Sequence, residues 1–392
     1  MKRFIIAALA LLLALGANGQ QALDSGAPVV SPQINGDNSV TFRLIAPKAV
    51  RVQVAGDFLP AEGVDKADVP SMADMTEKDG IWEYTTKPLA SELYSYSFIV
   101  DGLQILDPNN VYINRDVASV MNIFITGNGQ GDYYKVNDVR HGTVRKVWYD
   151  SPTLGTTRRM TIYTPPGYEE DKKTRYPVFY LLHGAGGDEE AWMDLGRTSQ
   201  IMDNLIAQGK AEPMIVVMTN GNAGEISAPG QGPDGFKAPG FRQRGMMDGA
   251  FEMSFCDVIN YVERNFRVYK DKKHRAIAGL SMGGYHSMHI SKYYPDTFDY
   301  VGLFSAAARF HENSQSPVYQ NEKEQIARQF KNAPKLYWIA IGNTDFLYDE
   351  NVKLREHFDR MGYPYVYHES EEGHIWRNWR KYLTMFVPQL FK

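Results

Sequence analysis

A nine-residue stretch, 276–284 (AIAGLSMGG), constrains the fold of this chain more than any other feature. Its first residues form a short apolar run typical of a strand, and a helix-like segment follows Ser281. Gly279, Ser281 and Gly283 have the spacing G-x-S-x-G, in which a serine stands on a sharp turn between a strand and a helix. Neighbours without side chains let the strand and the helix approach closely. The stretch therefore predicts a serine hydroxyl presented at the edge of a sheet, although a Gly/Ser-rich turn without function would match the same pattern.

The chain around this stretch, from about residue 133 to the end, alternates between strand-like and helix-like segments. The helix-like segments include 199–208, 251–266 and 351–361, the second with apolar residues at helical spacing. Such alternation is typical of a mostly parallel sheet covered by helices on both faces. In these sheets the functional residues gather beyond the carboxyl ends of the strands. The strand-like segments are 159–164, 176–182, 214–219, 275–278, 301–304, 336–341 and 365–368.

Two downstream loops offer the partners that a nucleophilic serine needs. A serine hydroxyl reacts well only when a base takes its proton and an acid orients that base. Asp345 follows the strand-like run 336–341, and His374 follows the last strand-like run. The order serine, acid, histidine is that of the α/β-hydrolases. We therefore predict Ser281, Asp345 and His374 as a catalytic triad, with Asp349 on the same loop as the alternative acid.

A second requirement is a pair of backbone N–H groups that face the developing oxyanion. One N–H should belong to Met282, directly after the serine, and the other to a loop that follows an early strand. Residues 183–187 (HGAGG) occupy that place, and we assign the second N–H to Ala185. The glycines allow the backbone to approach a substrate. An ordinary glycine-rich loop is the alternative interpretation.

Residues 28–126 predict a separate all-β domain. Short segments in which polar and apolar residues alternate are separated by Gly, Pro, Asn and Asp, as in a β-sandwich. A glycine-rich segment, 127–132, predicts a linker to the second domain, 133–392. The aromatic strand residues are either a stacking platform for sugar rings or core residues, and we favour the core. These aromatic residues are Trp82, Tyr84, Tyr94 and Tyr96.

Residues 1–19 predict a signal for export. Lys2 and Arg3 precede an apolar run, 4–15, and small residues then lead to a cleavage site after Gly19. The apolar run is too short to span a bilayer, so we expect no membrane anchor in the mature chain. The single cysteine, Cys256, allows no internal disulfide, which favours a bacterial periplasm or the extracellular space over a eukaryotic secretory route.

Charge and motif content exclude several other classes. The chain has 42 Lys and Arg against 46 Asp and Glu and no basic run, so nucleic acid is not an expected partner. No metal-binding motif, cysteine cluster, dinucleotide fingerprint or phosphate-binding loop is visible in the sequence. We therefore predict neither a metal nor a cofactor.

Several of these motifs together resemble known families. The second domain resembles carbohydrate esterase family 1, within the esterase-D-like α/β-hydrolases, and the first is similar to the immunoglobulin-like sandwich related to carbohydrate-binding family 48. The resemblance implies an α/β-hydrolase preceded by a small all-β sandwich. The esterase motifs are 183–187 (HGAGG), 279–284 (GLSMGG), 342–345 (GNTD) and 373–380 (GHIWRNWR), and the sandwich motifs are 46–49, 54–58, 94–96, 100–102 and 107–109.

By this resemblance, the chain is expected to be an exported serine esterase that releases ferulate or related hydroxycinnamates. The expected partners are plant cell-wall xylan and its feruloylated oligosaccharides. Three alternatives stay open: an acetylxylan esterase, a siderophore esterase of the enterobactin type, and a carbohydrate-binding protein without enzymatic activity. An acyltransferase would share the same site.

A long Gly/Pro-rich loop, 220–247, follows a strand and is expected to line the rim of the site. Candidate substrate contacts are Phe241 and Arg242 on this loop, and Trp192 and Trp376 after the catalytic loops. An unpatterned surface is the alternative for the first pair, and ordinary core packing is the alternative for the two tryptophans.

Overall fold

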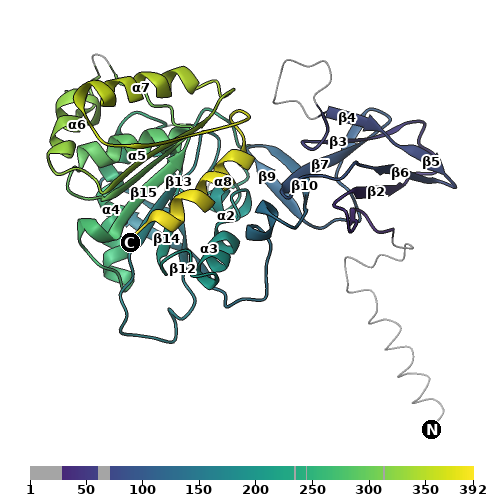
Figure 1. Cartoon of the computed structure of the whole chain (residues 1–392), viewed down its shortest axis with the longest axis horizontal. Helices are drawn as coiled ribbons and strands as arrows, with labels where there is room; N and C mark the ends of the chain where they lie inside the picture. Colours follow the sequence, from purple (N-terminus) through teal and green to yellow (C-terminus); the bar gives the residue numbers. More distant parts are fainter. Residues whose placement is uncertain (1–28, 61–70, 234, 244, 312–313) are drawn as a thin grey trace, which may run out of the picture.

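The computed structural model of the chain describes residues 29–60, 71–233, 235–243, 245–311 and 314–392 (Figure 1). The predicted signal peptide, 1–19, lies outside these residues. No helix in the described ranges is both long and apolar enough to cross a membrane.

Within the described ranges, the second domain is built on one sheet of eight strands in the order β11-β12-β14-β13-β15-β16-β17-β18. From β14 to β18 all neighbours are parallel, as the alternating segments predict, and β11 and β12 add an antiparallel edge. β11 is not among the strands predicted from the sequence. The strands are β11 (Thr143–Ser151), β12 (Thr156–Thr164), β13 (Val178–Leu182), β14 (Ile215–Thr219), β15 (Arg275–Leu280), β16 (Tyr300–Phe304), β17 (Leu336–Gly342) and β18 (Val366–Ser370).

Helices cover both faces of this sheet, because successive strand residues point to opposite faces and both sets are apolar. On one face, Ile277 and Leu303 belong to a core cluster that includes side chains of α4, α5, α6 and α7. On the other, Ala278 and Phe304 belong to a cluster with side chains of α2, α3 and α8. The helices are α2 (Ala191–Asp194), α3 (Thr198–Ala207), α4 (Ala250–Asn265), α5 (Met282–Tyr293), α6 (Glu322–Lys331), α7 (Tyr348–Met361) and α8 (Trp376–Phe386).

The first part of the chain forms two β-sheets that share a core. One has the order β1-β2-β6-β5, and the other has the order β4-β3-β7-β10-β9, with β8 also paired to β7. Phe42 from the first sheet packs against Tyr96 from the second, with ring centroids 4.8 Å apart. The strands are β1 (Gln33–Ile34), β2 (Val40–Ile45), β3 (Val52–Gly56), β4 (Ser71–Asp74), β5 (Thr76–Lys78), β6 (Ile81–Thr85), β7 (Leu93–Val100), β8 (Leu103–Ile105), β9 (Ile113–Asp116) and β10 (Ser119–Ile125).

The aromatic residues that the sequence leaves open between core and sugar platform lie in this core. Trp82, Tyr94 and Tyr96 are buried, and Tyr84 is half-buried and packs against them. Buried rings cannot stack on a sugar, so the core interpretation holds for the three buried residues. The relation of these sheets to carbohydrate-binding modules stays a prediction.

The β-sheets are joined to the second domain through α8. Arg380 of α8 is only 3% exposed, pairs with Glu92 at 3.0 Å and donates a hydrogen bond to the carbonyl of Leu93. The predicted linker, 127–132, contains part of the 3₁₀ helix η2 (Gln130–Tyr133), and Gly131 within it is buried. This joint is therefore packed, and it holds β9 next to α2 (Figure 1).

Candidate active site

The serine of the sharp turn lies between β15 and α5 with φ 52° and ψ −113°, a backbone conformation that residues other than glycine rarely adopt. Gly279 and Gly283 must lack side chains because neighbouring backbone atoms lie where their Cβ atoms would be. A Cβ at Gly279 would lie 2.4 Å from the carbonyl carbon of Gly283, and a Cβ at Gly283 would lie 2.2 Å from the oxygen of Leu182. Hydrogen bonds hold the strained residue, since the N–H of Ser281 donates to Phe304 at 2.9 Å.

The predicted base and acid lie together at the same edge of the sheet. His374 follows β18 and Asp345 follows β17. Nδ1 of His374 is 3.0 Å from Oδ1 and 2.9 Å from Oδ2 of Asp345, which is 3% exposed. The N–H of Leu347 donates to Oδ1 at 2.9 Å, which fixes the carboxylate. The alternative acid, Asp349, is exposed on the first turn of α7.

The histidine thus carries its Nδ1 proton toward the acid, which leaves Nε2 as the nitrogen that could accept a proton from a serine. No hydrogen bond joins Ser281 to His374 among the described residues. In a ligand-free site this contact is often long and shortens when the substrate binds. Both residues follow carboxyl ends of strands in one parallel sheet, so the fold sets them at the same edge.

The glycine-rich loop after β13 lies directly against the serine. A Cβ at Gly184 would be 3.3 Å from the Cβ of Ser281. Within the described chain, the N–H groups of Ala185 and Met282 do not donate to another backbone group. Met282 is the first residue of α5, where N–H groups have no partner inside the helix. Both N–H groups are therefore free to bind a substrate oxygen.

His183 positions this loop, a role that was not predicted from the sequence. Its side chain is buried, Nδ1 donates to the carbonyl of Gly184 at 2.7 Å, and Nε2 accepts the N–H of Gly221 at 2.7 Å. The imidazole must be neutral to make both bonds. It links the loop after β13 to the loop after β14.

We expect this neutral imidazole to make the protein sensitive to acid. Burial lowers the pKa of His183 to about 4, whereas an unfolded histidine titrates near 6.5. Between these values the unfolded chain binds a proton that the folded chain does not, so stability falls as the pH drops through this window. The expected loss of unfolding free energy is about 2 kcal/mol between pH 7 and pH 5.

Urea unfolding at the two pH values measures this loss. In the variant His183→Gln the loss should be smaller by that amount, because the titrating group is gone. The variant His274→Gln removes a partly exposed histidine that pairs with Asp271 outside this network, and it should keep the wild-type dependence. Equal pH dependence in His183→Gln and wild type would contradict the prediction.

The predicted aromatic contacts separate into buried and accessible residues. Trp192 is 1% exposed and donates its indole N–H to Leu182, so its prediction as a substrate contact is wrong. Its ring packs in the core, 5.3 Å from the half-buried ring of Trp376. Sequence reasoning missed Phe346, which is 76% exposed and whose ring centroid is 4.5 Å from that of His374. Its position directly after Asp345 in the sequence could have identified Phe346 as a residue of the site.

The long loop after β14 lies beside the site, as predicted. Buried Arg158 of β12 holds its first part by donating hydrogen bonds to the carbonyls of Asn220, Asn222 and Glu225. Arg242 lines a cavity of about 210 Å³ in this loop. The other lining residues are Asp188, Asn220, Glu225, Ser227, Ala228, Pro229, Gly230, Gly232, Gly235, Lys237, Ala238, Pro239, Gly240 and Gln243.

Two further contacts bring distant segments to the glycine-rich loop. A Cβ at Gly186 would lie 2.7 Å from Val117, between β9 and β10, and 3.5 Å from the Cα of Phe241. Arg115 of β9 pairs with Asp188 at 2.5 Å. The exposed ring of Phe241 and the β9–β10 turn thus lie at the same loop as Ala185.

The family model named Esterase matches residues 151–390, which is more than half of the chain. The chain belongs to this family. The esterase is accordingly a serine carboxylic-ester hydrolase, and the reading as a carbohydrate-binding protein without enzymatic activity is not supported.

Curated relatives extend the comparison. An endo-1,4-beta-xylanase/feruloyl esterase of Xylanibacter ruminicola is 29% identical over 367 residues, covering 92% of this chain and 46% of the relative. The chain thus spans about half the length of that protein. An esterase of Mycobacterium tuberculosis is 24% identical over 415 residues, covering 86% of this chain and 85% of the relative.

Solved structures show the same fold. A ferulic acid esterase superposes with a TM-score of 0.51 at 27% identity, covering 64% of this chain and 97% of its own. The enterobactin esterase of Shigella flexneri has a TM-score of 0.59 over 90% of this chain and 93% of its own. Its identity is only 15%, so this second likeness concerns the fold alone.

Proposed function

We propose that this esterase hydrolyses hydroxycinnamoyl esters, such as feruloyl groups, on plant cell-wall xylan or its oligosaccharides. The observation that carries the proposal is the hydrogen-bonded pair of His374 and Asp345 at the sheet edge where Ser281 stands. The named activities of the relatives supply the substrate class.

In the proposed reaction, Ser281 attacks the ester carbonyl while Nε2 of His374 takes its proton. Asp345 holds the imidazole and stabilises its charged form. The N–H groups of Ala185 and Met282 bind the oxyanion. The sugar alcohol then leaves with the proton from His374, and a water molecule activated by the same histidine releases the acid.

The position of Phe346 favours a substrate whose acyl group is aromatic. A large exposed ring beside the base offers a face on which a hydroxycinnamoyl ring could stack, and such pairs contribute about 0.5–1.5 kcal/mol beyond buried area. An acetyl group has no ring to stack. Trp376 and the loop residues Phe241 and Arg242 are proposed as further contacts.

The variant Phe346→Ala is expected to lower kcat/KM for methyl ferulate by about 3–10-fold, the equivalent of one aromatic contact. Hydrolysis of 4-nitrophenyl acetate should change by less than about 2-fold, because its acyl group does not reach the ring. Steady-state kinetics on the two esters measures the difference. An equal loss on both substrates would show that Phe346 supports the catalytic loop and not the acyl group.

The experiment that tests the substrate class compares methyl ferulate, feruloylated arabinoxylan, acetylated xylan and a cyclic triester siderophore with one preparation. Preferred hydrolysis of the ferulate esters would support the proposal. Hydrolysis of acetylated xylan alone, or of the siderophore alone, would replace it by the corresponding alternative.

We also propose that the enzyme is exported to the bacterial periplasm or the medium. The support is the sequence pattern of residues 1–19. N-terminal sequencing of the protein from the periplasmic or culture fraction tests this, and a mature protein that begins at Gln20 is the expected result. Recovery of the uncleaved chain from the cytoplasm would contradict it.

A further inference from the structure

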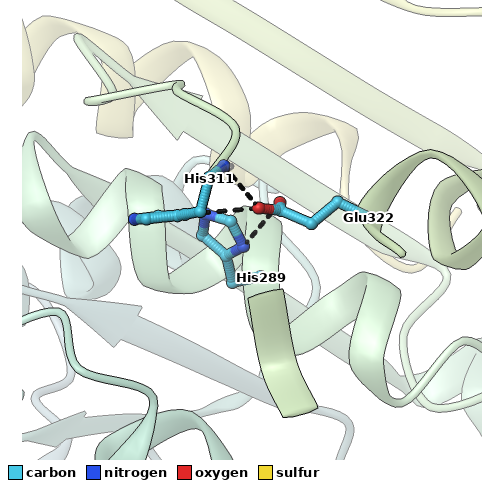
Figure 2. Close-up of side chains that lie close together, drawn as sticks. All are labelled: His289, His311 and Glu322. Atoms are coloured by element: carbon cyan, nitrogen blue, oxygen red, sulfur yellow. Dashed lines mark hydrogen bonds and ion pairs between the residues drawn. The ribbon is translucent and has the colours of Figure 1, made fainter. Parts of the chain in front are cut away.

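Three potential metal ligands, one of them on the helix α5 that follows Ser281, converge in the structure (Figure 2). They come from three segments: His289 from α5, His311 from the loop after β16, and Glu322 from the first turn of α6. One donor atom from each residue lies within 4.8 Å of the others. Among the described residues, these are the three histidine, cysteine or carboxylate side chains whose donor atoms lie close enough together to hold one metal ion.

The cluster is buried and its hydrogen bonding is incomplete. The side chains of His289 and Glu322 are 0% and 3% exposed. The backbone of Arg309 lies near the ring of His289, but neither ring nitrogen makes a hydrogen bond of ordinary geometry. Oε1 of Glu322 accepts the backbone N–H of His311 at 2.7 Å, whereas Oε2 makes no hydrogen bond of ordinary geometry and has only Nζ of Lys292 at 3.3 Å and the ring of His289 at 3.4 Å beside it. Buried polar atoms are nearly always satisfied in folded proteins, so this cluster has unused capacity for a ligand.

The two distances from the histidine nitrogens to the carboxylate oxygens suit a first-row transition metal. Nδ1 of His289 is 3.4 Å from Oε2 of Glu322, and Nδ1 of His311 is 3.2 Å from Oε1 (Figure 2). Ligands that bind Zn²⁺ tetrahedrally at about 2.0–2.1 Å lie about 3.3 Å from one another. Two imidazoles and one carboxylate favour Zn²⁺ over Mg²⁺ or Ca²⁺, which take mainly oxygen ligands.

His311 is oriented as a metal ligand usually is. Its Nε2 lies 3.1 Å from the hydroxyl of Tyr285, which leaves Nδ1 directed toward Glu322. Its ring stacks on Tyr319 with a centroid distance of 4.2 Å. Metal-binding histidines commonly use their second nitrogen in this way, because that bond fixes the tautomer and the ring orientation. The side chain is 25% exposed, which gives an ion a route from solvent.

Lys292 is the competing partner in this cluster. Its ammonium group lies 3.3 Å from Oε2 of Glu322 and donates to the carbonyl of Val318 and to Gln325. The carboxylate of Glu322 thus already has two partners, this ammonium group at Oε2 and the backbone N–H of His311 at Oε1. His289, however, is buried and has no hydrogen-bond partner at either ring nitrogen, so the ion pair leaves this ring available to a ligand.

We propose that His289, His311 and Glu322 form a Zn²⁺ site that ties α5 to α6 and to the loop after β16, with a remaining position for water. The site stands two helical turns from Ser281 and supplies no step of ester hydrolysis. Its role is structural: it fixes the helix whose first residue provides one of the N–H groups for the oxyanion. The inference does not depend on the substrate of the enzyme.

Calorimetric titration of the EDTA-treated full chain with ZnCl₂, together with thermal unfolding, tests the proposal. We expect one Zn²⁺ per chain and an increase in Tm with ZnCl₂ concentration, because the ion binds only the folded state. His311→Gln should weaken Zn²⁺ binding by about 100-fold or more and abolish the increase in Tm. His274→Gln, which removes a partly exposed histidine outside the cluster, should bind as the wild type does.

A second variant and a spectroscopic measurement keep the test independent of folding. His289→Asn should also lose Zn²⁺ binding, and Co²⁺ in the wild type should give visible absorption bands that both variants lack. Absence of Zn²⁺ binding to the wild type would overturn the proposal and leave an ion-pair network around Lys292 and Glu322. Binding to both variants with wild-type affinity would overturn it as well.

Discussion

The variant Ser281→Ala is expected to lower kcat for ester hydrolysis by about a million-fold, to the level left by binding and oxyanion contacts alone. The reason is that the hydroxyl forms the acyl intermediate, and no other group at this turn can replace it. The backbone at Ser281 is held by the hydrogen bond to Phe304 and by the flanking glycines, so alanine keeps the local geometry. Hydrolysis of methyl ferulate with and without a nucleophilic scavenger measures the loss.

The matched control is Ser291→Ala, on the same helix. Ser291 is buried and donates to the carbonyl of Met288, far along α5 from the turn. Both variants should have wild-type circular dichroism, and only Ser281→Ala should lose activity. Activity of Ser281→Ala above a hundredth of the wild-type value would contradict the assignment of the nucleophile.

The sheet and its helices were predictable because each level of the sequence favours the same fold. Apolar runs that suit strands buried on both faces alternate with segments at helical spacing. The parallel order then places every strand's carboxyl end at one edge. This is why chain order alone brought Asp345 and His374 to the same place, and why their hydrogen bond follows from the fold.

Other features depend on contacts between distant segments, which no local pattern encodes. His183 binds Gly221 across two loops, and Arg115 reaches Asp188 from a different sheet. Trp192 follows a catalytic loop, and its large ring suited a pocket wall as well as a core. The burial of Trp192 decided for the core, and that burial depends on Trp376 and the rest of α8, at the far end of the chain.

The zinc site shows the same limit more sharply. The three proposed ligands are spaced 22 and 11 residues apart, unlike the compact spacings of known zinc motifs. Their convergence requires α5, α6 and the intervening loop to be in place. The prediction that no metal is bound rested on motifs only, and the proposed site lies outside what motifs can detect.

A second large loss of activity is expected when Asp345, the acid of the predicted triad, is replaced. Asp345→Asn should lower kcat by about 10,000-fold while binding of the substrate changes little. Leu347 donates its N–H to Oδ1, so an asparagine would keep its oxygen there and place its amide nitrogen at the position of Oδ2. That position is 2.9 Å from Nδ1 of His374. An N–H group on Nδ1 would then face the amide N–H₂, and its remaining acceptor, Oδ1 at 3.0 Å, is already bound by Leu347. We therefore expect the imidazole to take the other tautomer, with its proton on Nε2.

A histidine protonated at Nε2 cannot accept the proton of Ser281, and the loss therefore falls on kcat and not on KM. Asp349→Asn is the matched control because this exposed carboxylate on α7 was the alternative acid. It should keep near wild-type kcat, since it does not contact His374. If Asp349→Asn lost more activity than Asp345→Asn, the roles of the two carboxylates would be exchanged. If neither lost activity, the histidine would act without a carboxylate partner, and the geometry at Asp345 would be structural only.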